Sequence, residues 1–329
     1  MNKNLKVKTV IALLASGWLN LFSAPPSDYY DTVQGKTGRE LRQALHEIIK
    51  NHVVIPYSSS TRTDTVDALD VLDQETMDAG NVVLVYSLRS EPKTNYPAIW
   101  THEHLWPQSR GIDASGPDYS DLFNLRPEDA TVNSARNNKY YDESDPLDSN
   151  YRNPAHVEAP LCSTDSDSWE PPASMNGDIS RSLFYMDVRY EGDKANEPDL
   201  KLTDFVNLIT SNDSFMGKLS MLLAWHRADP VSAAEEQRND LIYTQYQNNR
   251  NPFIDHPEWV DLIYRPRLTL INTGGSLQLG WGLEFSNAVL ETSTEFRNWT
   301  TVTNSPMPSN GQWIVLQVPS NNWQFYRLR

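Results

Sequence analysis

Two neighbouring residues in the segment WTHEHLWPQSRG, residues 100–111, have side chains that could hydrolyse a phosphodiester bond. This reaction needs a base that makes hydroxide, positive charge near the phosphate and help for the departing oxygen. The imidazole of His104, with an ordinary pKa near ~6.5, suits the first task at neutral pH. A hard dication suits the other two, and Mg²⁺ needs only one or two protein ligands because it keeps several waters. Glu103 and Asn133, which lies 29 residues after His104, offer that minimum of carboxylate and amide oxygens.

Other interpretations of these residues stay open when only their spacing is considered. A Glu-His pair is common in proteins, and an asparagine in a helix is usually a solvated side chain. His102 and His104 would share one face of a strand, as a zinc-binding pair does, although no third ligand stands nearby at a zinc spacing. The acidic loops DASGPDYSD and STDSDS could bind Ca²⁺. The residue types therefore permit a hydrolytic site without establishing it.

Short elements would position these side chains. Apolar runs bounded by turn residues predict strands at 82–87, 97–104 and 121–127. Glu128 and Asp129 would then open a helix that carries Asn133, since acids in the first turn suit the helix dipole. We therefore expect a short β-hairpin and a helix to form the metal site.

Longer helices are expected around this unit, where apolar residues recur at helical spacing. Leu41, Leu45 and Ile49 form one such stripe, with Thr37 as its N-cap, and Asp178 would cap another helix. The predicted helices are 35–52, 178–190, 214–229 and 232–247. The segment 142–176 is rich in Asp, Ser and Pro, and is expected to be a long surface loop.

The first 24 residues have the layout of a secretory signal peptide. Three lysines precede an apolar run over residues 10–22, and small residues follow at Ser23 and Ala24. No later segment is long and apolar enough to span a bilayer, so we expect a secreted or periplasmic protein that leaves the membrane after signal cleavage. No obligate protein partner is evident. Removing the signal changes the formal charge from −15 to −18, which argues against a protein that wraps nucleic acid with a basic face.

The C-terminal residues 266–329 change character, with short alternating stretches separated by Gly, Pro and Asn. This pattern predicts a small β-sandwich module, similar to units appended to secreted proteins in some bacterial lineages. Trp299, Trp313, Trp323 and Tyr326 could either form a surface that stacks on a ligand or fill the core of the module. Cys162 is the only cysteine, which excludes internal disulfides and cysteine-based zinc sites.

The ordered motifs of the chain closely resemble those of the endonuclease I family, which are secreted and periplasmic nucleases of the His-Me finger (ββα-metal) fold group. Members carry Glu-His-x-x-Pro, then Asp-x-x-Asn-Leu-x-Pro, then Val-Asn-x-x-Arg-x-Asn. The matching residues are Glu103, His104 and Pro107; Asp121, Asn124, Leu125 and Pro127; and Val132, Asn133, Arg136 and Asn138. The likeness continues through 176–192, 225–240 and 248–259, and so covers nearly all of residues 28–265.

The resemblance implies roles for individual residues. His104 would be the general base that deprotonates the attacking water. Glu103 and Asn133 would hold Mg²⁺, with Ca²⁺ or Mn²⁺ as substitutes. Cleavage would leave 5′-phosphate and 3′-hydroxyl ends. Asn124 would orient the imidazole through its second nitrogen or, in the alternative interpretation, stabilise a turn.

The chain departs from the better-known branch of the family, which is rich in disulfides and places a transition-state arginine in an insertion between the motifs. The connection here is shorter. Arg110, six residues after His104, is our first candidate for that charge, followed by Arg126 and Arg136. Arg136 could contact phosphate or brace its helix, and Asn138 would lie beside the substrate.

We therefore expect an α+β fold with three parts: a signal peptide at 1–24, a nuclease domain at 25–265 wrapped by helices, and the β module at 266–329. The expected substrate is DNA and RNA without sequence preference, because the matched site contacts phosphates rather than base edges. An extracellular Ca²⁺-binding or adhesion protein on a decayed nuclease scaffold is the alternative, against which the intact Glu103, His104 and Asn133 argue. A zinc hydrolase built on His102 and His104 is a third hypothesis.

Overall fold

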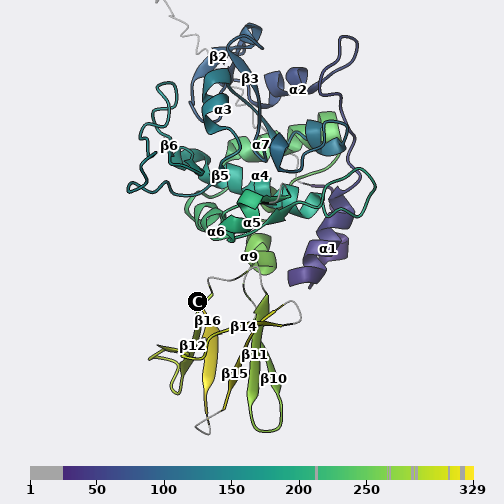
Figure 1. Cartoon of the computed structure of the whole chain (residues 1–329). Helices are drawn as coiled ribbons and strands as arrows, with labels where there is room; N and C mark the ends of the chain where they lie inside the picture. Colours follow the sequence, from purple (N-terminus) through teal and green to yellow (C-terminus); the bar gives the residue numbers. More distant parts are fainter. Residues whose placement is uncertain are drawn as a thin grey trace, which may run out of the picture.

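Helix α4 (Asn176–Arg189), which is buried on nearly every side, organises the α+β region of the protein (Figure 1). This computed structural model describes residues 25–329, except 212–213, 265, 267, 283–284, 286–287, 310–311 and 319–322. The predicted signal peptide at 1–24 lies outside the described residues. Apolar and charged side chains of α4 are both buried from Ile179 to Arg189, so neighbouring elements must cover its whole circumference.

The helices around α4 are mostly short. They are α1 (Gly38–Ile49), α2 (Thr65–Leu72), α3 (Ala130–Arg136), α5 (Val206–Ser211), α6 (Leu219–Ala228), α7 (Ala233–Leu241), α8 (Pro252–Asp255) and α9 (Glu258–Tyr264). Helices α1, α6 and α8 contact α4 directly. Single turns of other helix types are η1 (Asp31–Val33), η2 (Lys93–Asn95), η3 (Gln108–Arg110), η4 (Pro117–Ser120), η5 (Ala173–Met175) and the π-helical η6 (Ile242–Gln247). In the described part of the chain, no helix has the length and apolar character needed to cross a membrane.

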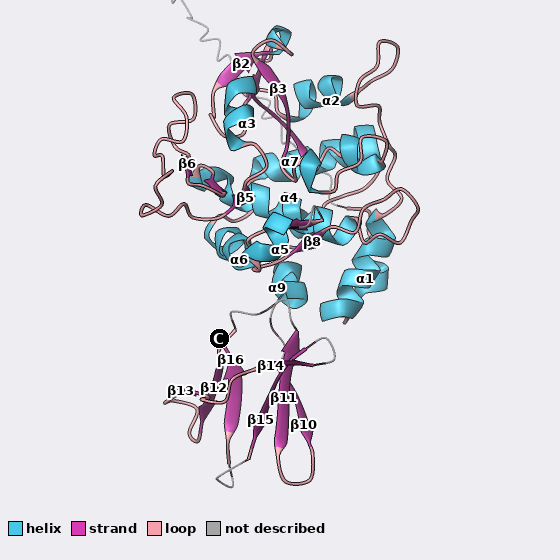
Figure 2. Ribbon diagram, in the orientation of Figure 1, coloured by secondary structure: helices cyan, strands magenta, loops and turns pink. Residues whose placement is uncertain are grey.

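The strands of the α+β region form small separate sheets (Figure 2). Antiparallel pairs join β1 (Asn81–Val83) to β2 (Ser90–Pro92) and β3 (Trp100–His104) to β4 (Leu125–Asp129). Strands β5 (Tyr140–Tyr141), β7 (Ser168–Glu170) and β6 (Ser163–Thr164) form a three-stranded sheet in that order, and β8 (Lys201–Leu202) runs parallel to β9 (Phe215–Met216). The helices therefore supply most of the framework, and each of these sheets joins only two or three short strands.

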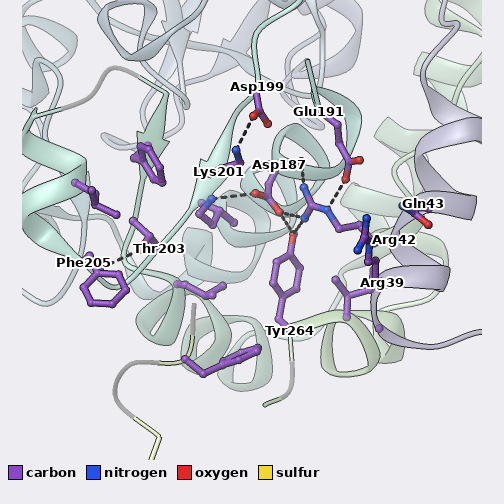
Figure 3. A pocket seen from close by; sticks show the side chains of 17 residues that line it. Arg39, Arg42, Gln43, Asp187, Glu191, Asp199, Lys201, Thr203, Phe205 and Tyr264 are labelled. Atoms are coloured by element: carbon purple, nitrogen blue, oxygen red, sulfur yellow. Dashed lines mark hydrogen bonds and ion pairs between the residues drawn. The ribbon is translucent and has the colours of Figure 1, made fainter. Parts of the chain in front are cut away.

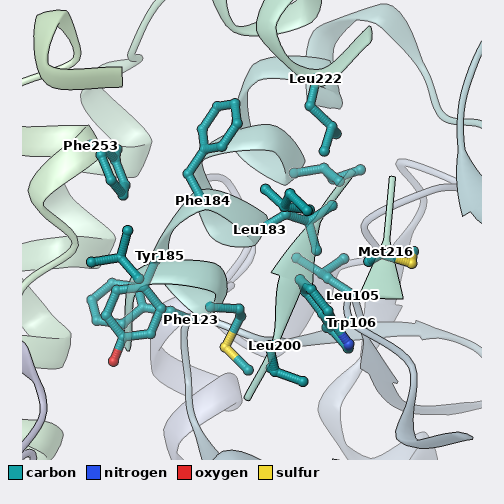
Figure 4. Packing of buried hydrophobic residues seen from close by; sticks show 14 of the residues in the cluster. Leu105, Trp106, Phe123, Leu183, Phe184, Tyr185, Leu200, Met216, Leu222 and Phe253 are labelled. Atoms are coloured by element: carbon teal, nitrogen blue, oxygen red, sulfur yellow. The ribbon is translucent and has the colours of Figure 1, made fainter. Parts of the chain in front are cut away.

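The main hydrophobic core joins α4 to the segments that flank β3 and β4. Figure 4 shows Leu183 of α4, Leu222 of α6 and Trp106, which follows β3, among its members. Phe123, just before β4, packs against Tyr185 of α4 with 4.5 Å between ring centroids. Trp106 and Phe123 are almost inaccessible to solvent. Because these two residues flank the β3–β4 pair, their burial holds that pair in a close-packed interior.

Two antiparallel sheets follow α9 and form the C-terminal module. One sheet has the order β10-β11-β15-β14, with β10 (Thr269–Asn272), β11 (Leu277–Gly282), β15 (Gln312–Gln317) and β14 (Met307–Ser309). The other has the order β13-β12-β16, with β13 (Thr300–Thr301), β12 (Leu290–Ser293) and β16 (Phe325–Leu328). Leu279, Trp281, Leu290 and Val315, which come from both sheets, form one buried cluster. The predicted α+β class and the β-rich C-terminal part are confirmed.

Several local predictions differ from the structure. The strand expected at 82–87 ends at Val83, because the chain turns there and the Leu88 N–H donates to the Leu84 carbonyl. The predicted cap Asp178 lies within the first turn of α4, whose N-cap is Met175. The segment 142–176, expected to be a surface loop, contains β6, β7 and η5.

Candidate active site

Strands β3 and β4, followed directly by α3, bring the predicted catalytic side chains together. Asp129 ends β4 and caps α3, because its Oδ1 accepts a 2.8 Å hydrogen bond from a backbone N–H of the first turn. Asn133, one turn into α3, donates from Nδ2 to the carbonyl of His102 in β3 at 2.8 Å. This cross-link holds α3 against β3, and it leaves the amide oxygen of Asn133 for another partner.

A cleft of about 490 Å³ opens between the end of β3 and α3. The residues that line it are His102, Glu103, His104, Pro107, Gln108, Ser109, Asn133, Ser134, Arg136, Asn137 and Asn138. Five of the predicted site residues are therefore neighbours here: Glu103, His104, Asn133, Arg136 and Asn138. The predicted Arg110, Asn124 and Arg126 do not line the cleft.

His104 is held as a neutral imidazole with one nitrogen available to accept a proton. Its Nε2 lies 3.0 Å from the Tyr119 carbonyl, which can only accept a hydrogen bond, so Nε2 carries the proton. Its Nδ1 accepts a 3.2 Å hydrogen bond from the side-chain amide of Gln108. Burial lowers the pKa of His104 to about 4, partly offset by the Tyr119 carbonyl. His104 is therefore neutral at pH 7, with its proton on Nε2, and Nδ1 is its basic atom.

Glu103 is a buried carboxyl group whose negative charge is only partly stabilised by its neighbours. Its Oε1 accepts a 2.7 Å hydrogen bond from the Tyr86 hydroxyl and lies 3.2 Å from Nη1 of Arg136. In the described part of the chain, its other oxygen, Oε2, accepts no hydrogen bond. Burial raises the pKa of Glu103 to about 7, although Arg136 and Tyr86 lower it. A cation close to this group would offset the cost of burying its charge.

The oxygens of Glu103 and Asn133 fit a hard divalent cation. One is a carboxylate oxygen and the other an amide oxygen, and both side chains line the same cleft. Mg²⁺ commonly uses one or two protein ligands and completes its shell with water and substrate oxygens. Ca²⁺ and Mn²⁺ also prefer oxygen donors, so the donor set does not select one of these ions.

Arg136 lines the cleft, but its guanidinium contacts the backbone of β3 and Glu103. Its guanidinium donates to the carbonyls of His104 and Leu105 at 3.1 and 2.7 Å, and lies 4.8 Å from the Tyr141 ring centroid. The side chain is only 1% exposed. Arg136 therefore fixes the backbone at the end of β3 and supplies a positive charge beside Glu103.

The other two candidate arginines are committed elsewhere, which corrects their predicted roles at the cleft. Arg110 is buried and donates to the carbonyls of Asn138 and Ile209. Arg126 is paired with Asp73 at 2.6 Å and Asp178 at 3.4 Å. These partners are distant in the sequence, so the spacing from His104 could not reveal them.

The predicted contact between Asn124 and His104 is also absent from this site. The Asn124 side chain accepts from the backbone N–H of Trp106 at 2.7 Å and donates to the Trp106 carbonyl at 3.1 Å. It therefore clamps the segment after β3, while the Tyr119 carbonyl orients the imidazole. A backbone carbonyl leaves no mark in a sequence motif, so the motif could not identify this partner.

Two other groups of metal-ligating residue types already have partners within the protein. His102 Nε2 lies 2.8 Å from the hydroxyl of Thr65, so this nitrogen is already engaged in the described structure. His46, Glu47 and Asp193 form a separate cluster of metal-ligating types. Lys50 Nζ lies 2.6 Å from Glu47 and 3.3 Å from Asp193, so this cluster already contains a cation.

The acidic loops use their carboxylates to shape the backbone. Asp165, in the segment STDSDS, accepts from the backbone N–H groups of Asp145 at 2.8 Å and Ser168 at 2.7 Å. Asp113, in DASGPDYSD, accepts from the backbone N–H of Ser115 at 2.9 Å. These contacts are those of turn-forming side chains, which also explains the frequent Asp and Ser residues.

A second cavity, of about 570 Å³, lies between α1, β8 and α9 (Figure 3). Its centre holds Arg42, which pairs with Asp187 and Glu191, while the Tyr264 hydroxyl also donates to Asp187. Apolar side chains, including Phe205, form much of the remaining wall. The paired charges tie α1 to the end of α4, and this cavity is separate from the cleft beside His104.

Comparison with known proteins agrees with this geometry. The endonuclease I family model matches residues 37–258. The chain is 43% identical over 249 residues to an extracellular ribonuclease of Bacillus amyloliquefaciens, covering 74% of this chain and 80% of that protein. It is 41% identical over 252 residues to an extracellular ribonuclease of Bacillus subtilis (strain 168), covering 74% of this chain and 81% of that protein. The matched region contains Glu103, His104 and Asn133 together, and the chain belongs to the endonuclease I family.

Proposed function

We propose that the protein is a secreted, Mg²⁺-dependent endonuclease that cuts DNA and RNA with little sequence preference. The observation that carries this proposal is the position of the neutral His104 Nδ1 in a cleft that it shares with oxygens of Glu103 and Asn133. A general base and a site for a hard cation are the two requirements of phosphodiester hydrolysis by water. The extracellular relatives support secretion, and the family supports a phosphodiester hydrolase.

The metal site of the proposal consists of Glu103 and Asn133, with β3, β4 and α3 as the ββα-metal unit. A bound Mg²⁺ would supply positive charge to a phosphate oxygen and to the departing 3′ oxygen. The Asn133 amide is already oriented, because its nitrogen donates to the His102 carbonyl. The carboxylate of Glu103 is oriented by Tyr86 and Arg136, so neither ligand has to be ordered when the ion binds.

The chemical step assigned to His104 is removal of a proton from the attacking water by Nδ1. The imidazolium that results keeps its Nε2 hydrogen bond to the Tyr119 carbonyl, which stabilises the new positive charge. The Gln108 amide must first leave Nδ1. Gln108 is exposed and its hydrogen bond is 3.2 Å long, so substrate or water can displace it at little cost. The resulting hydroxide would bond to phosphorus while the bond from phosphorus to the 3′ oxygen breaks. The 3′ oxygen would take a proton from water, which leaves 5′-phosphate and 3′-hydroxyl ends.

The test is cleavage of plasmid DNA and of RNA by residues 25–329 with EDTA, Mg²⁺ or Zn²⁺, followed by analysis of the product ends. Cleavage that needs Mg²⁺ and leaves 5′-phosphates is expected. Glu103→Gln should raise the Mg²⁺ concentration for half-maximal activity by about tenfold or more, because a neutral amide replaces the only anionic ligand. Zn²⁺-specific activity, or an unchanged Mg²⁺ requirement in the variant, would contradict this metal site.

A further inference from the structure

The C-terminal module carries a cluster of aromatic rings on the outer face of the β12–β16 pair. In this pair Ser293 lies opposite Phe325. The neighbouring positions Leu290, Tyr326 and Leu328 belong to the core between the two sheets. Because side chains alternate along a strand, Phe325 and Arg327 face away from that core. The chain after β12 adds Phe296 and Trp299 to the same face.

Ring and guanidinium contacts join these four residues into one surface. The rings of Phe296 and Phe325 are 3.7 Å apart between centroids, and the Arg327 guanidinium lies 4.3 Å from the Trp299 ring centroid. Phe296 packs one side on Phe325 and is still 62% exposed. We call Phe296, Trp299, Phe325 and Arg327 the aromatic–arginine patch.

The backbone at Phe296 is not explained by packing. Its φ angle is 63°, in the left-handed region that bulky side chains rarely adopt. Burial of the ring could offset such strain, but most of this ring remains in solvent. Strained residues are often retained where they position a group for function. The Phe296 ring contacts Phe325 on one side, and its 62% exposure leaves much of the remaining surface open to solvent.

The charge around the patch also differs from that of the rest of the protein. Residues 266–329 contain four arginines, three glutamates and no lysine or aspartate, whereas the whole chain has a formal charge of −15. Arg327 Nε donates to Glu291 at 2.6 Å, and its Nη atoms have no hydrogen-bond acceptor among the described residues. Arg329, which follows β16, has a side chain that is 78% exposed, with its Nη1 4.0 Å from Glu291. Exposed guanidinium groups of this kind bind phosphates.

We propose that the aromatic–arginine patch is a second nucleic-acid site that binds single strands. A base stacks on the outward face of Phe296, and a neighbouring phosphate contacts the Nη atoms of Arg327. Duplexes are excluded because their bases are already stacked on one another, whereas the bases of a single strand are free to stack on protein rings. The inference rests on the proposed function, in that the bound strand is the enzyme's own substrate.

The location of the patch defines what it would do. Figures 1 and 2 place β12 and β16 at the end of the molecule opposite β3 and α3, so a base on Phe296 is not at the cleft. A strand held there remains attached while another part of it enters the cleft, which raises the local substrate concentration. The patch should therefore lower KM for long single strands and leave the cleavage of very short ones unchanged.

The test measures binding without cleavage. Full-length His104→Ala protein in EDTA is titrated into a fluorescent 15-nucleotide oligouridylate, and affinity is read by anisotropy. EDTA also removes divalent ions from the cleft and so weakens binding there. Adding Phe296→Asn removes the ring, while asparagine tolerates the left-handed backbone. Loss of one stacked base predicts affinity about 5- to 150-fold weaker. Arg327→Gln should weaken binding and make it less sensitive to salt.

A matched control and competing ligands keep the test decisive. Met307→Ala removes a side chain of similar exposure, 63%, from β14 in the other sheet, and should leave the affinity unchanged. The proposal would be overturned if the parent and Phe296→Asn bind RNA with equal affinity. Near-ultraviolet circular dichroism must show that the module is folded in both proteins. Binding of a neutral polysaccharide that only Phe296→Asn abolishes, with RNA binding unaltered, would replace it with a glycan site. Failure of the proposed function is seen separately, as absence of Mg²⁺-dependent cleavage by the parent.

Discussion

The cleft region and the C-terminal module use charged and aromatic side chains in opposite ways. Around the cleft, Glu103 and Arg136 are buried and contact each other, and Arg136 also holds the backbone of β3. In the module, the only large ring that is nearly inaccessible is Trp281, whereas Phe296 is 62% exposed, considering the residues that the structure describes. Rate and stability are therefore coupled at the cleft, since the same groups fold and position the site. In the module, exposed aromatic residues can be substituted without loss of packing in the small core.

The largest effect is expected from substituting the two histidines of β3. Comparing the two variants separates catalysis in the cleft from the stability of the strand that lines it. His104→Ala removes the proposed base and should reduce kcat by about 10²- to 10⁴-fold. His102→Ala removes a side chain that bonds Thr65, and should mainly lower the melting temperature. Steady-state cleavage and thermal unfolding of both variants provide the measurement. Equal losses of kcat would mean that His104 has no special role.

The buried arginines provide the next comparison. Arg136→Met leaves Glu103 without its positive neighbour, which should raise the pKa of that carboxyl further and weaken metal binding at neutral pH. Breaking a buried ion pair also costs about 3–5 kcal/mol of stability. We expect kcat/KM to fall by about 10²-fold, a loss comparable to removing one transition-state contact.

Arg110→Met is the control for that variant. It loses hydrogen bonds to backbone carbonyls, at about 1–3 kcal/mol each, but should change kcat/KM by less than roughly threefold. A large loss of kcat in Arg110→Met at an unchanged melting temperature would restore Arg110 as the transition-state residue.

These two comparisons show what the sequence could predict about the site. The proximity of Glu103, His104 and Asn133 is predictable from the sequence, because ordered motifs place them on adjoining strand and helix elements. The contacts of Arg110 and Arg126 are not predictable in this way, since their partners Ile209 and Asp73 are distant in the chain. The same limitation applies to the Tyr119 carbonyl and to Tyr86, whose contacts arise from loop geometry and burial. Local patterns predicted the elements, and tertiary packing decided which polar groups remain available for chemistry.

The fold also contains elements that local sequence patterns predict and elements that tertiary contacts decide. The apolar stripe of the predicted helix 35–52 corresponds to α1, with Leu41, Leu45 and Ile49 buried. The strand predicted at 82–87 was shortened by a turn that its apolar composition does not encode. Helices with a strong periodic face were therefore predictable, whereas short strands depended on partners elsewhere in the chain.

Core substitutions should make the difference between the two regions visible in stability. Trp281→Ala truncates the largest member of the four-residue module cluster and should cost about 3–5 kcal/mol, enough to unfold so small a core. Cleavage of short substrates should persist, because the cleft belongs to another core. Trp106→Ala should reduce stability and activity together, since Trp106 follows β3, its ring is fully buried in the main core, and its Nε1 donates to the Arg110 carbonyl at 2.6 Å. Limited proteolysis combined with activity measurements would distinguish the two outcomes, and loss of short-substrate cleavage in Trp281→Ala would show that the regions are coupled.

The smallest effect on cleavage is expected from a pH dependence of stability that should be confined to the α+β region. Burial, followed by the nearby negative charge of Glu235, raises the pKa of Asp178 to about 7. In the unfolded chain an aspartate titrates near ~3.9, so between about pH 4 and 7 the folded state binds more protons than the unfolded state. The free energy of unfolding should therefore decrease as pH rises through this window, by at most about 1.4 kcal/mol per pH unit for one proton.

Asp178→Asn removes that titration, so its stability relative to the parent should increase from pH 4.5 to pH 8. Urea unfolding at several pH values measures the difference, with Asp199→Asn as the control, because its exposed pair with Lys201 contributes little at any pH. The unfolding transition of the module, followed separately, should not respond to Asp178→Asn. A constant difference between Asp178→Asn and the parent across this range would mean that Asp178 is ionised in the folded protein. Its neighbours Arg126 and Arg181 would then compensate its charge more completely than burial opposes it.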